Sequence, residues 1–507
     1  MIGKPVTAVW EITMGCNMRC KHCGSSCHSA LPGELTTDEA LGLCDDLGEL
    51  GLQWVSLSGG EPTTRKDWPL IAARLTQNGV IPNIITNGWL FNQEILEQAI
   101  NAGVGTIAFS VDGLQETHDF IRREGSYRRI MQAIELCHSR NMEVTAITTI
   151  SKMNLGELTG LKQELVLWGV KAWQVQIGFP MGNMADHHRM VIEPADVDTI
   201  IDFAYQCMQE SSIDVIPADC IGYYNLKEMA VYKKIFSGTF NWQGCTAGKQ
   251  SFGILHNGDI LGCTSIRDKD FVEGNIRNTP LKLIWENPAN FGWNRNRKKE
   301  DLGGFCSQCR FGDRCLGGCS NCNLTMGGSV NAENHYCSYN QAIKKRIKLF
   351  EQVESSAELV AMGRNFAEKG YCQLAESALQ VATQRNNGED DIELLSLYGY
   401  VSFRLGNYQT ALNVNDRVLQ KKPDDVYALK GKGICLSYLG NYEDGIELLN
   451  KAVSLTDASF MDPYYDLAVI LSEMGRKSEA IAVIEAGRIK SEQFISLSQD
   501  LYEQLVG

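Results

Sequence analysis

The sequence has no long apolar run and no excess of positive charge. No stretch approaches the roughly 20 apolar residues that cross a bilayer, so we expect no membrane-spanning segment and no membrane partner. Lys and Arg number 47 against 61 Asp and Glu, which gives a formal net charge of −14. A surface that follows nucleic-acid phosphates needs the opposite sign of charge, so nucleic acid is not expected as a partner.

The first residues also lack the pattern of an export signal. MIGKPVTAVWEITMGC has no basic stretch followed by an apolar segment, which predicts a cytoplasmic protein. Disulfides are rare in that reducing compartment, so the 18 cysteines indicate metal or redox chemistry. One dense basic group, residues 295–299 (RNRKK), is expected to be a solvated loop rather than a binding patch.

Up to about residue 180, short β-branched runs alternate with longer segments of helical pattern. Strands spaced by helices in this way form a parallel sheet. Six strands predict an incomplete barrel, a partial (β/α)6 TIM-like α/β fold, in which functional residues collect on the loops that follow the strands. The predicted strands are Val6–Ile12, Trp54–Leu57, Ile81–Thr86, Ile107–Val111, Val144–Ile150 and Trp173–Ile177.

A chain of 507 residues is too long for one hydrophobic core. Residues 1–200 are predicted to form the barrel core and residues 201–240 a connecting helical segment. In residues 241–345 Gly, Cys and Asn become frequent, which is typical of a small region that metal holds together. Residues 356–507 carry a helical pattern throughout and are expected to form an all-α array.

This last part repeats itself. Gly406, Gly440 and Gly475 are spaced by 34 and 35 residues, and Gly370 is a weaker fourth member. The period and the Leu-Gly-Asn-Tyr turns resemble tetratricopeptide repeats. Stacked helix pairs of this kind form a concave surface that usually holds a peptide or a protein. An array that serves only stability or dimerisation is the alternative.

Three cysteines in one short loop form the first candidate site. Cys16, Cys20 and Cys23 supply three thiolates, and a cube-shaped iron–sulfur cluster takes four, so one iron stays open. An open iron can chelate the amino and carboxylate groups of an amino acid, which S-adenosylmethionine offers. A zinc site is the alternative, with His22 or Cys27 as its fourth ligand.

A glycine-rich turn favours the cluster over zinc. The cysteine loop follows the first expected strand, and the turn Gly59–Pro62 (GGEP) follows the second. Together they resemble the radical S-adenosylmethionine superfamily. The resemblance implies a 4Fe-4S cluster that a flavodoxin- or ferredoxin-type protein reduces. It also implies cleavage of S-adenosylmethionine to a 5′-deoxyadenosyl radical that abstracts hydrogen from a substrate.

The same resemblance implies contacts with S-adenosylmethionine. In the family the glycine-rich turn receives the methionyl ammonium, and Ser110 and Asp112 match the position near the ribose. Asn87 and Gln176 stand at equivalent strand ends, and either is equally a capping residue. His22 stands where the family commonly has an aromatic ring beside adenine. The expected contact residues are Gly59, Gly60, Glu61, Pro62, Asn87, Ser110, Asp112 and Gln176.

A second cysteine set lies between residues 245 and 337. Its spacing resembles the seven-cysteine pattern of the SPASM extension of radical enzymes, and two zinc ribbons are the alternative. SPASM domains carry two auxiliary 4Fe-4S clusters, which implies three clusters in this chain. By the resemblance the nearer auxiliary cluster is held by Cys245, Cys263 and Cys319, and the farther one by Cys306, Cys309, Cys315 and Cys337.

The sequence departs from sulfatase-maturing members of this group at two positions. Ser251 stands where they have a further cysteine, and Thr264 stands where they have an aspartate base. Sulfatase maturation is therefore not expected. Either the nearer cluster has an open iron or Cys322 supplies a fourth thiolate, and both alternatives stay open.

Enzymes that resemble this pairing mostly modify peptides, by crosslinking, thioether formation, epimerisation or oxidation. Many carry a peptide-recognition domain before the first cluster, but only fifteen residues precede Cys16. We therefore expect the helical array to bind a precursor peptide or protein instead. One alternative is a radical enzyme that acts on a small molecule or in cofactor assembly, with the array docking a partner enzyme. The other is a non-catalytic iron–sulfur relay or scaffold.

Residues outside these motifs carry weaker expectations. No catalytic residue follows from the sequence. Asp119 and Arg122 are candidates for a polar contact in the site or, equally, for a surface ion pair of little energetic value. The scattered cysteines are each expected to be a small buried hydrophobic residue: Cys44, Cys137, Cys207, Cys220, Cys372 and Cys435.

Overall fold

The computed structural model describes residues 3–218, 220–236, 242–386 and 391–506. The chain divides into two compact units, one with residues 1–307 and 311–341 and the other with residues 308–310 and 342–507. The predicted junction at residues 240 and 241, and the chain ends at residues 1 and 507, lie outside the described residues. The other domain boundaries stay predictions.

One sheet runs through the first unit in the order β10-β9-β8-β1-β2-β3-β4-β5-β6-β7. All neighbours from β8 to β7 pair in parallel, and β9 and β10 are antiparallel additions at one edge. The six predicted strands are all present, as β1 (Thr7–Thr13), β2 (Trp54–Gly59), β3 (Ile81–Thr86), β4 (Thr106–Ser110), β5 (Glu143–Ile150) and β6 (Ala172–Ile177). The predicted partial α/β barrel is confirmed.

The sheet also extends beyond the six predicted strands at both edges. A short strand, β7 (Asp214–Pro217), pairs with β6 and lies inside the segment predicted to be a helical connection. At the other edge β8 (Ser251–Ile254), β9 (Asp259–Leu261) and β10 (Val272–Asn275) continue the sheet from the Cys-rich region. The core and that region therefore share one sheet.

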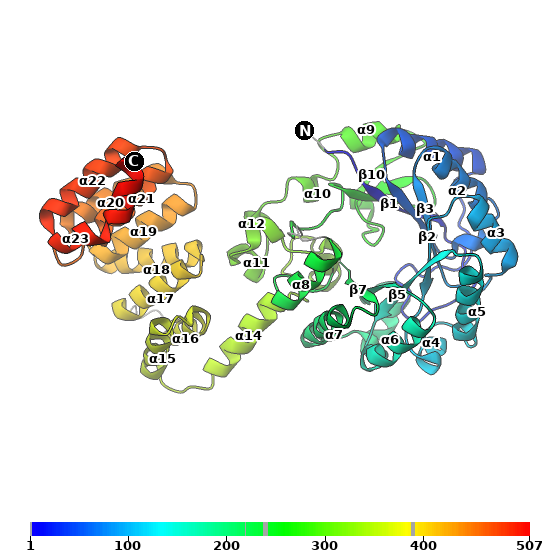
Figure 1. Ribbon diagram of the computed structural model, residues 1–507, viewed down its shortest axis with the longest axis horizontal. Helices are drawn as coiled ribbons and strands as arrows, with labels where there is room; N and C mark the ends of the chain where they lie inside the picture. Colours follow the sequence, from blue (N-terminus) through cyan, green and yellow to red (C-terminus); the bar gives the residue numbers. More distant parts are fainter. Residues whose placement is uncertain (1–2, 219, 237–241, 387–390, 507) are drawn as a thin grey trace. The chain divides into compact units, whose positions relative to one another are not determined.

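The core of the first unit lies between this sheet and the helices around it, as Figure 1 shows. Ala8, Trp10 and Ile12 alternate along β1, are fully buried and pack in the same cluster as Leu43 and Leu47 of α1. The surrounding helices are α1 (Thr37–Leu50), α2 (Trp68–Gln77), α3 (Gln93–Asn101), α4 (Gln115–Ile121), α5 (Ser126–Ser139), α6 (Leu158–Leu167), α7 (Val197–Glu210) and α8 (Leu226–Ile235). Alternation with period two therefore places the apolar side chains of the strand against the helices.

Short helices follow in the Cys-rich region. They are α9 (Leu281–Glu286), α10 (Gly292–Arg295), α11 (Gly304–Gln308), α12 (Gly312–Cys315) and α13 (Ser320–Gly327), followed by α14 (Ser338–Phe350). Helices of four to eight residues bury little apolar surface. This agrees with a region that its cofactors stabilise.

The second unit is entirely helical, as predicted. It contains α15 (Ser356–Glu368), α16 (Cys372–Arg385), α17 (Ile392–Arg404), α18 (Tyr408–Lys421), α19 (Val426–Tyr438), α20 (Tyr442–Leu455), α21 (Asp462–Glu473), α22 (Lys477–Lys490), α23 (Glu492–Leu497) and α24 (Gln499–Val506). Gly370, Gly406, Gly440 and Gly475 each follow the first helix of a pair, with φ between 75° and 91°. The repeated glycines therefore end helices in the left-handed conformation, and the assignment to tetratricopeptide repeats stays a prediction.

In the part of the chain that the structure describes, no helix combines the length and the apolar character needed to cross a membrane.

Candidate active site

The loop that follows β1 is held against the turn that follows β2. The N–H of Gly60 donates to the carbonyl oxygen of Thr13, and that of Glu61 to Gly15, both at 2.8 Å. A Cβ on Gly60 would lie 2.1 Å from the carbonyl oxygen of Gly15. A Cβ on Gly59 would lie 2.2 Å from that of Thr13. Both positions therefore require glycine because two backbones meet there.

Cys16, Cys20 and Cys23 gather on this loop, with Cys20 buried and the other two partly buried. Burial raises the pKa of Cys16 and raises that of Cys20 to about 11, and the charge of Cys23 raises both further. The thiol of Cys27 donates a hydrogen bond to Cys23 and lowers its pKa to about 5. Cys23 is thus the thiol most easily ionised among the three.

The chemistry of this set of three thiols fits an iron–sulfur cluster. Across the described residues, no three His, Cys, Asp or Glu side chains lie close enough to bind one metal ion. A cube-shaped cluster is larger than an ion and keeps its thiolates farther apart. Two donors also face the thiols at 3.9 Å, Asn87 Nδ2 toward Cys16 Sγ and Arg122 Nη1 toward Cys20 Sγ. Such donors stabilise anionic thiolate ligands.

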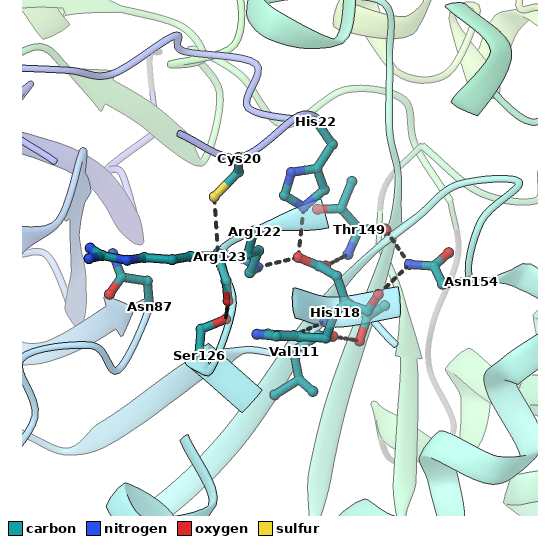
Figure 2. Close-up of polar contacts among 12 residues, drawn as sticks. Cys20, His22, Asn87, Val111, His118, Arg122, Arg123, Ser126, Thr149 and Asn154 are labelled. Carbon is teal, nitrogen blue, oxygen red and sulfur yellow. Dashed lines mark hydrogen bonds and ion pairs between the residues drawn. The ribbon is translucent and has the colours of Figure 1, made fainter. Parts of the chain in front are cut away.

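A buried ion pair stands next to the cysteine loop (Figure 2). The carboxylate of Asp112 is 0 % exposed, pairs with Arg122 and accepts a hydrogen bond at 2.7 Å from Nε2 of His22. Its other oxygen accepts the N–H of Thr149 at 2.8 Å. Burial opposes ionisation, but the charges of Arg122 and His22 hold the pKa of Asp112 well below its usual range. Asp112 therefore fastens the cysteine loop to β4 and β5, and its contact with a ribose stays a prediction.

Arg122 therefore pairs with Asp112 and not with Asp119, which the sequence had left open as its partner. The alternative of a surface ion pair between Asp119 and Arg122 is wrong, because the Arg122 side chain is only 10 % exposed and pairs with Asp112. Asp119 instead accepts the N–H groups of Gly125 and Tyr127, each at 2.9 Å, at the start of α5. Spacing along the sequence could not identify the partner of Arg122, since β4 brings Asp112 to it.

Glu61 of the glycine-rich turn joins the end of β2 to the end of β3. It is 1 % exposed, and its oxygens accept from Thr86 Oγ1 at 2.8 Å and from the N–H of Asn87 at 2.7 Å. Thr63 donates to it from both its hydroxyl and its N–H. Burial raises the pKa of Glu61 despite these donors. The side chain thus holds the turn in place, and the contact of this turn with the methionyl ammonium stays a prediction.

The remaining predicted contact residues lie at the carboxyl ends of the strands. Asn87 follows β3 and donates to Asn17 Oδ1 of the cysteine loop at 2.8 Å. Ser110 ends β4 and is half-buried. Gln176, near the end of β6, donates to Thr149 Oγ1 at 3.1 Å. The fold brings these side chains to the edge of the sheet that carries the cysteine loop, and their contact with S-adenosylmethionine stays a prediction.

A second ion pair crosses from the barrel to the Cys-rich region, and the sequence gave no signal for it. Arg267, in the loop after Cys263, pairs with Glu11 of β1 and donates to Ser25 Oγ at 2.6 Å. Glu11 is 5 % exposed, and its Oε2 has no hydrogen-bond partner. The carboxylate of Glu11 and the guanidinium of Arg267 thus lie near Ser25, just after the cysteine loop.

Three cysteines of the second set lie beside Tyr223 and Trp242. Cys337, Cys315 and Cys319 pack in one cluster with these two rings. The N–H of Cys319 donates to the hydroxyl of Tyr223 at 2.9 Å. Cys309 falls in residues 308–310, which group with the helical unit, so its place among the ligands of the farther cluster stays a prediction.

Two further cysteines lie beside Cys319. Burial raises the pKa of Cys319 well above its usual value, and the charges of Cys220, Cys245 and Cys322 raise it further. Cys322 is fully buried, and its thiol lies 3.9 Å from Asn334 Oδ1. Cys220 is buried, as expected, and its charge acts on both Cys319 and Cys322. Whether Cys322 binds the nearer cluster stays a prediction.

The basic group at residues 295–299 is not the solvated loop that was expected. Arg297 is only 6 % exposed. Arg295 stacks over the rings of Trp285 and Phe291 at 4.6 and 4.5 Å. The prediction was wrong at these two arginines because the loop folds inward against the Cys-rich region.

Two family models match the chain. The model of the radical SAM superfamily matches residues 10–164, and that of the SPASM iron-sulfur cluster-binding domain matches residues 245–310. The first match covers the cysteine loop and the glycine-rich turn, and the second covers the start of the auxiliary cysteine set. Iron–sulfur clusters and S-adenosylmethionine are the cofactors that these two models imply.

Individual relatives cover about two thirds of the chain. An AdoMet-dependent heme synthase of Methanosarcina barkeri is 32% identical over 349 residues, which are 67% of this chain and 98% of the relative. A PqqA peptide cyclase of Bradyrhizobium diazoefficiens is 27% identical over 367 residues, 70% of this chain and 91% of the relative. The crystal structure of Streptococcus suis SuiB bound to its precursor peptide SuiA has a TM-score of 0.53 at 18% identity and covers 66% of this chain and 76% of SuiB. At that identity the structural likeness shows the fold.

Proposed function

The chain belongs to the radical SAM superfamily, and on this premise we propose that it abstracts hydrogen from a peptide and installs a modification in it. The cluster bound by Cys16, Cys20 and Cys23 would supply the electron that cleaves S-adenosylmethionine to a 5′-deoxyadenosyl radical. The protein binds and orients both reactants. The observation that carries the proposal is the contact between the cysteine loop and the glycine-rich turn, together with a pocket in the helical unit.

The chain's own residues keep the reacting site rigid. Asp112, Arg122 and His22 fix the cysteine loop to β4 and β5, and Glu61 fixes the neighbouring turn to β3. Rigid placement of this kind reduces the entropic cost of bringing two reactants together. Glu11 and Arg267 stand on the side of the Cys-rich region, where they can orient a polar group of the substrate.

The helical unit offers a place for the peptide. A pocket lies between α17, α18, α19 and α21, lined by aromatic and polar side chains that include Tyr400, Phe403, Asn415, Tyr427, Lys430 and Asp466. Lys430 Nζ lies 3.4 Å from Asp466 and 5.2 Å from the centre of the Tyr427 ring. Apolar walls with a few polar groups are typical of sites that hold a ligand, which supports this pocket as the site for a side chain of the peptide.

A reductant would meet the first unit at the cysteine loop. Arg19, Arg123 and Arg129 are exposed around this loop, and Lys21 is half-buried there. In the described part of the chain none of the four forms an ion pair with a carboxylate. A basic patch on a protein of net charge −14 favours an acidic partner, which supports a flavodoxin- or ferredoxin-type reductant.

The test begins with the anaerobically reconstituted full chain, dithionite and S-adenosylmethionine. Formation of 5′-deoxyadenosine that is lost in Cys16→Ala establishes the radical reaction. The neighbouring genes are then searched for a short precursor peptide, which is added to the reaction, and mass spectrometry is expected to show a changed mass. A reaction without 5′-deoxyadenosine would leave only the relay or scaffold function.

A tetrapyrrole is the second candidate substrate. It is favoured by the relative that is 32% identical across 98% of its own length and is named an AdoMet-dependent heme synthase. The same reaction with an iron porphyrin in place of the peptide, followed by absorbance for heme, separates the two. Heme formation with an unmodified peptide would overturn the peptide proposal, and the helical unit would then serve to dock a partner enzyme.

A further inference from the structure

Arg297 is a buried cation with unused hydrogen-bond donors. It follows α10 in the Cys-rich region and is 6 % exposed. Its Nη1 donates to Ser320 Oγ at 3.0 Å and to the carbonyl oxygen of Leu316 at 3.3 Å. Its Nε and Nη2 are buried and have no hydrogen-bond partner. Among the residues that the structure describes, no carboxylate lies within ion-pair distance of it.

Such an arrangement is costly without an anion nearby. A buried charge that lacks a partner strongly destabilises a protein. A buried polar group without a hydrogen bond therefore indicates an ion or another group that binds there. The position of Arg297 identifies which group this is.

Arg297 lies between two loops that carry ligands of the proposed nearer cluster. Asn294, three residues earlier, donates from Nδ2 to the carbonyl oxygens of Cys245 and Ala247, at 2.9 and 2.7 Å. On the other side Ser320, which Arg297 contacts, directly follows Cys319. Burial lowers the pKa of Arg297, and the charges of Cys245 and Cys319 are among those that oppose this.

We propose that Arg297 is the counter-ion of the auxiliary cluster held by Cys245, Cys263 and Cys319, and that its Nε and Nη2 donate to the sulfur atoms of that cluster. Thiolate ligands make an iron–sulfur cluster anionic, and reduction adds one more negative charge. A buried cation with free N–H groups stabilises the more negative form. Arg297 thereby raises the reduction potential of this cluster and makes it the better electron acceptor.

This inference depends on the cluster ligands and not on the identity of the substrate. Its test therefore needs neither peptide nor S-adenosylmethionine, and a failure would leave the proposed function untouched. The converse also holds, since an inactive enzyme with the expected potentials would overturn only the proposed function.

The experiment is a redox titration followed by electron paramagnetic resonance. The full chain carries Cys16→Ala, Cys20→Ala and Cys23→Ala, so that the signal of the first cluster is absent. Arg297→Gln is expected to reduce the ratio of reduced to oxidised cluster at a fixed potential about tenfold for one auxiliary cluster, which is about 59 mV for one electron. Arg297→Lys keeps the positive charge, so the reduction potential is expected to shift by less than half as much as in Arg297→Gln.

Arg295→Gln is the matched control. Arg295 belongs to the same segment and is also partly buried, with one unpartnered nitrogen, but the charge that acts on it is that of Glu273. Its replacement is expected to leave both potentials unchanged. Equal shifts in the two variants, or no shift in Arg297→Gln, would overturn the proposal.

A second measurement applies if Arg297→Gln fails to retain its clusters. Arginine labelled with ¹⁵N is incorporated into the chain with native Arg297, and electron–nuclear double resonance is recorded on the reduced auxiliary clusters. A ¹⁵N coupling to one cluster that disappears in Arg297→Lys is expected. The absence of any ¹⁵N coupling would overturn the contact.

Discussion

Arg122 and Asp112 form a buried ion pair, and the guanidinium of Arg122 also lies 3.9 Å from the sulfur of Cys20. One residue thus links β4 to the cysteine loop. Together with His22 of the same loop, which donates to Asp112, the pair fixes the loop to the sheet.

Removal of Arg122 should destabilise the first unit strongly. Arg122→Met leaves the carboxylate of Asp112 buried without its cation, and we expect a loss of about 3–5 kcal/mol in the free energy of unfolding. Denaturant unfolding of the anaerobic protein measures this. Lys227→Met, which removes the exposed pair with Asp202, is the control and should cost less than about 1 kcal/mol. Similar losses in both variants would contradict the structural role of the buried pair.

The backbone at Gly60 lies so close to the cysteine loop that even a methyl side chain should disturb the site. Gly60→Ala places a Cβ 2.1 Å from the carbonyl oxygen of Gly15, so the turn must move away from the cysteine loop. We expect at least a tenfold weaker affinity for S-adenosylmethionine, measured by calorimetry on the reconstituted protein. Gly42→Ala in α1 has no atom within 4 Å of the new Cβ and should leave the affinity unchanged. Unaltered affinity in Gly60→Ala would show that the turn tolerates displacement.

The raised pKa of Glu228 in α8 should make the free energy of unfolding depend on pH. Glu228 is 2 % exposed, and burial raises the pKa of its carboxyl to about 7. The folded state then holds a proton that the unfolded state has lost, so stability falls as pH rises toward 7 and is constant above it. Between pH 6 and 8 the loss is about 1.4 kcal/mol. Glu228→Gln should remove this slope in thermal unfolding, and an identical slope in both proteins would assign it to another group.

The pocket of the helical unit can be filled without touching the first unit. In Gly431→Ala the new Cβ would lie 2.7 Å from Asn415 Nδ2, between the walls of the pocket. We expect peptide affinity to fall at least tenfold, while the rate of 5′-deoxyadenosine formation without peptide stays the same. Ile489→Ala in α22, at a side chain 88 % exposed, is the control and should bind as the native protein does. Undiminished peptide affinity in Gly431→Ala would show that the peptide does not bind in this pocket.

Local sequence patterns predicted most of the fold. The β-branched runs gave all six core strands because each is bounded by turn residues and buried on its helix-facing side. The strand β7 escaped prediction, since Asp214–Pro217 is four residues long and ends in proline. It exists because its backbone completes hydrogen bonds with β6. The strands of the Cys-rich region were likewise too short to predict.

The sequence by itself determined the family and the six core strands, because cysteine spacing, glycine-rich turns and β-branched runs are local patterns along the chain. Only the tertiary structure decided which charges meet. Asp112, just after the end of β4, pairs with Arg122. Glu11 of β1 pairs with Arg267 of the Cys-rich region, and Arg297 is buried within that region. The physical reason is that a buried charge is stable only beside its counter-charge, and long-range packing, not spacing along the chain, brings the two together.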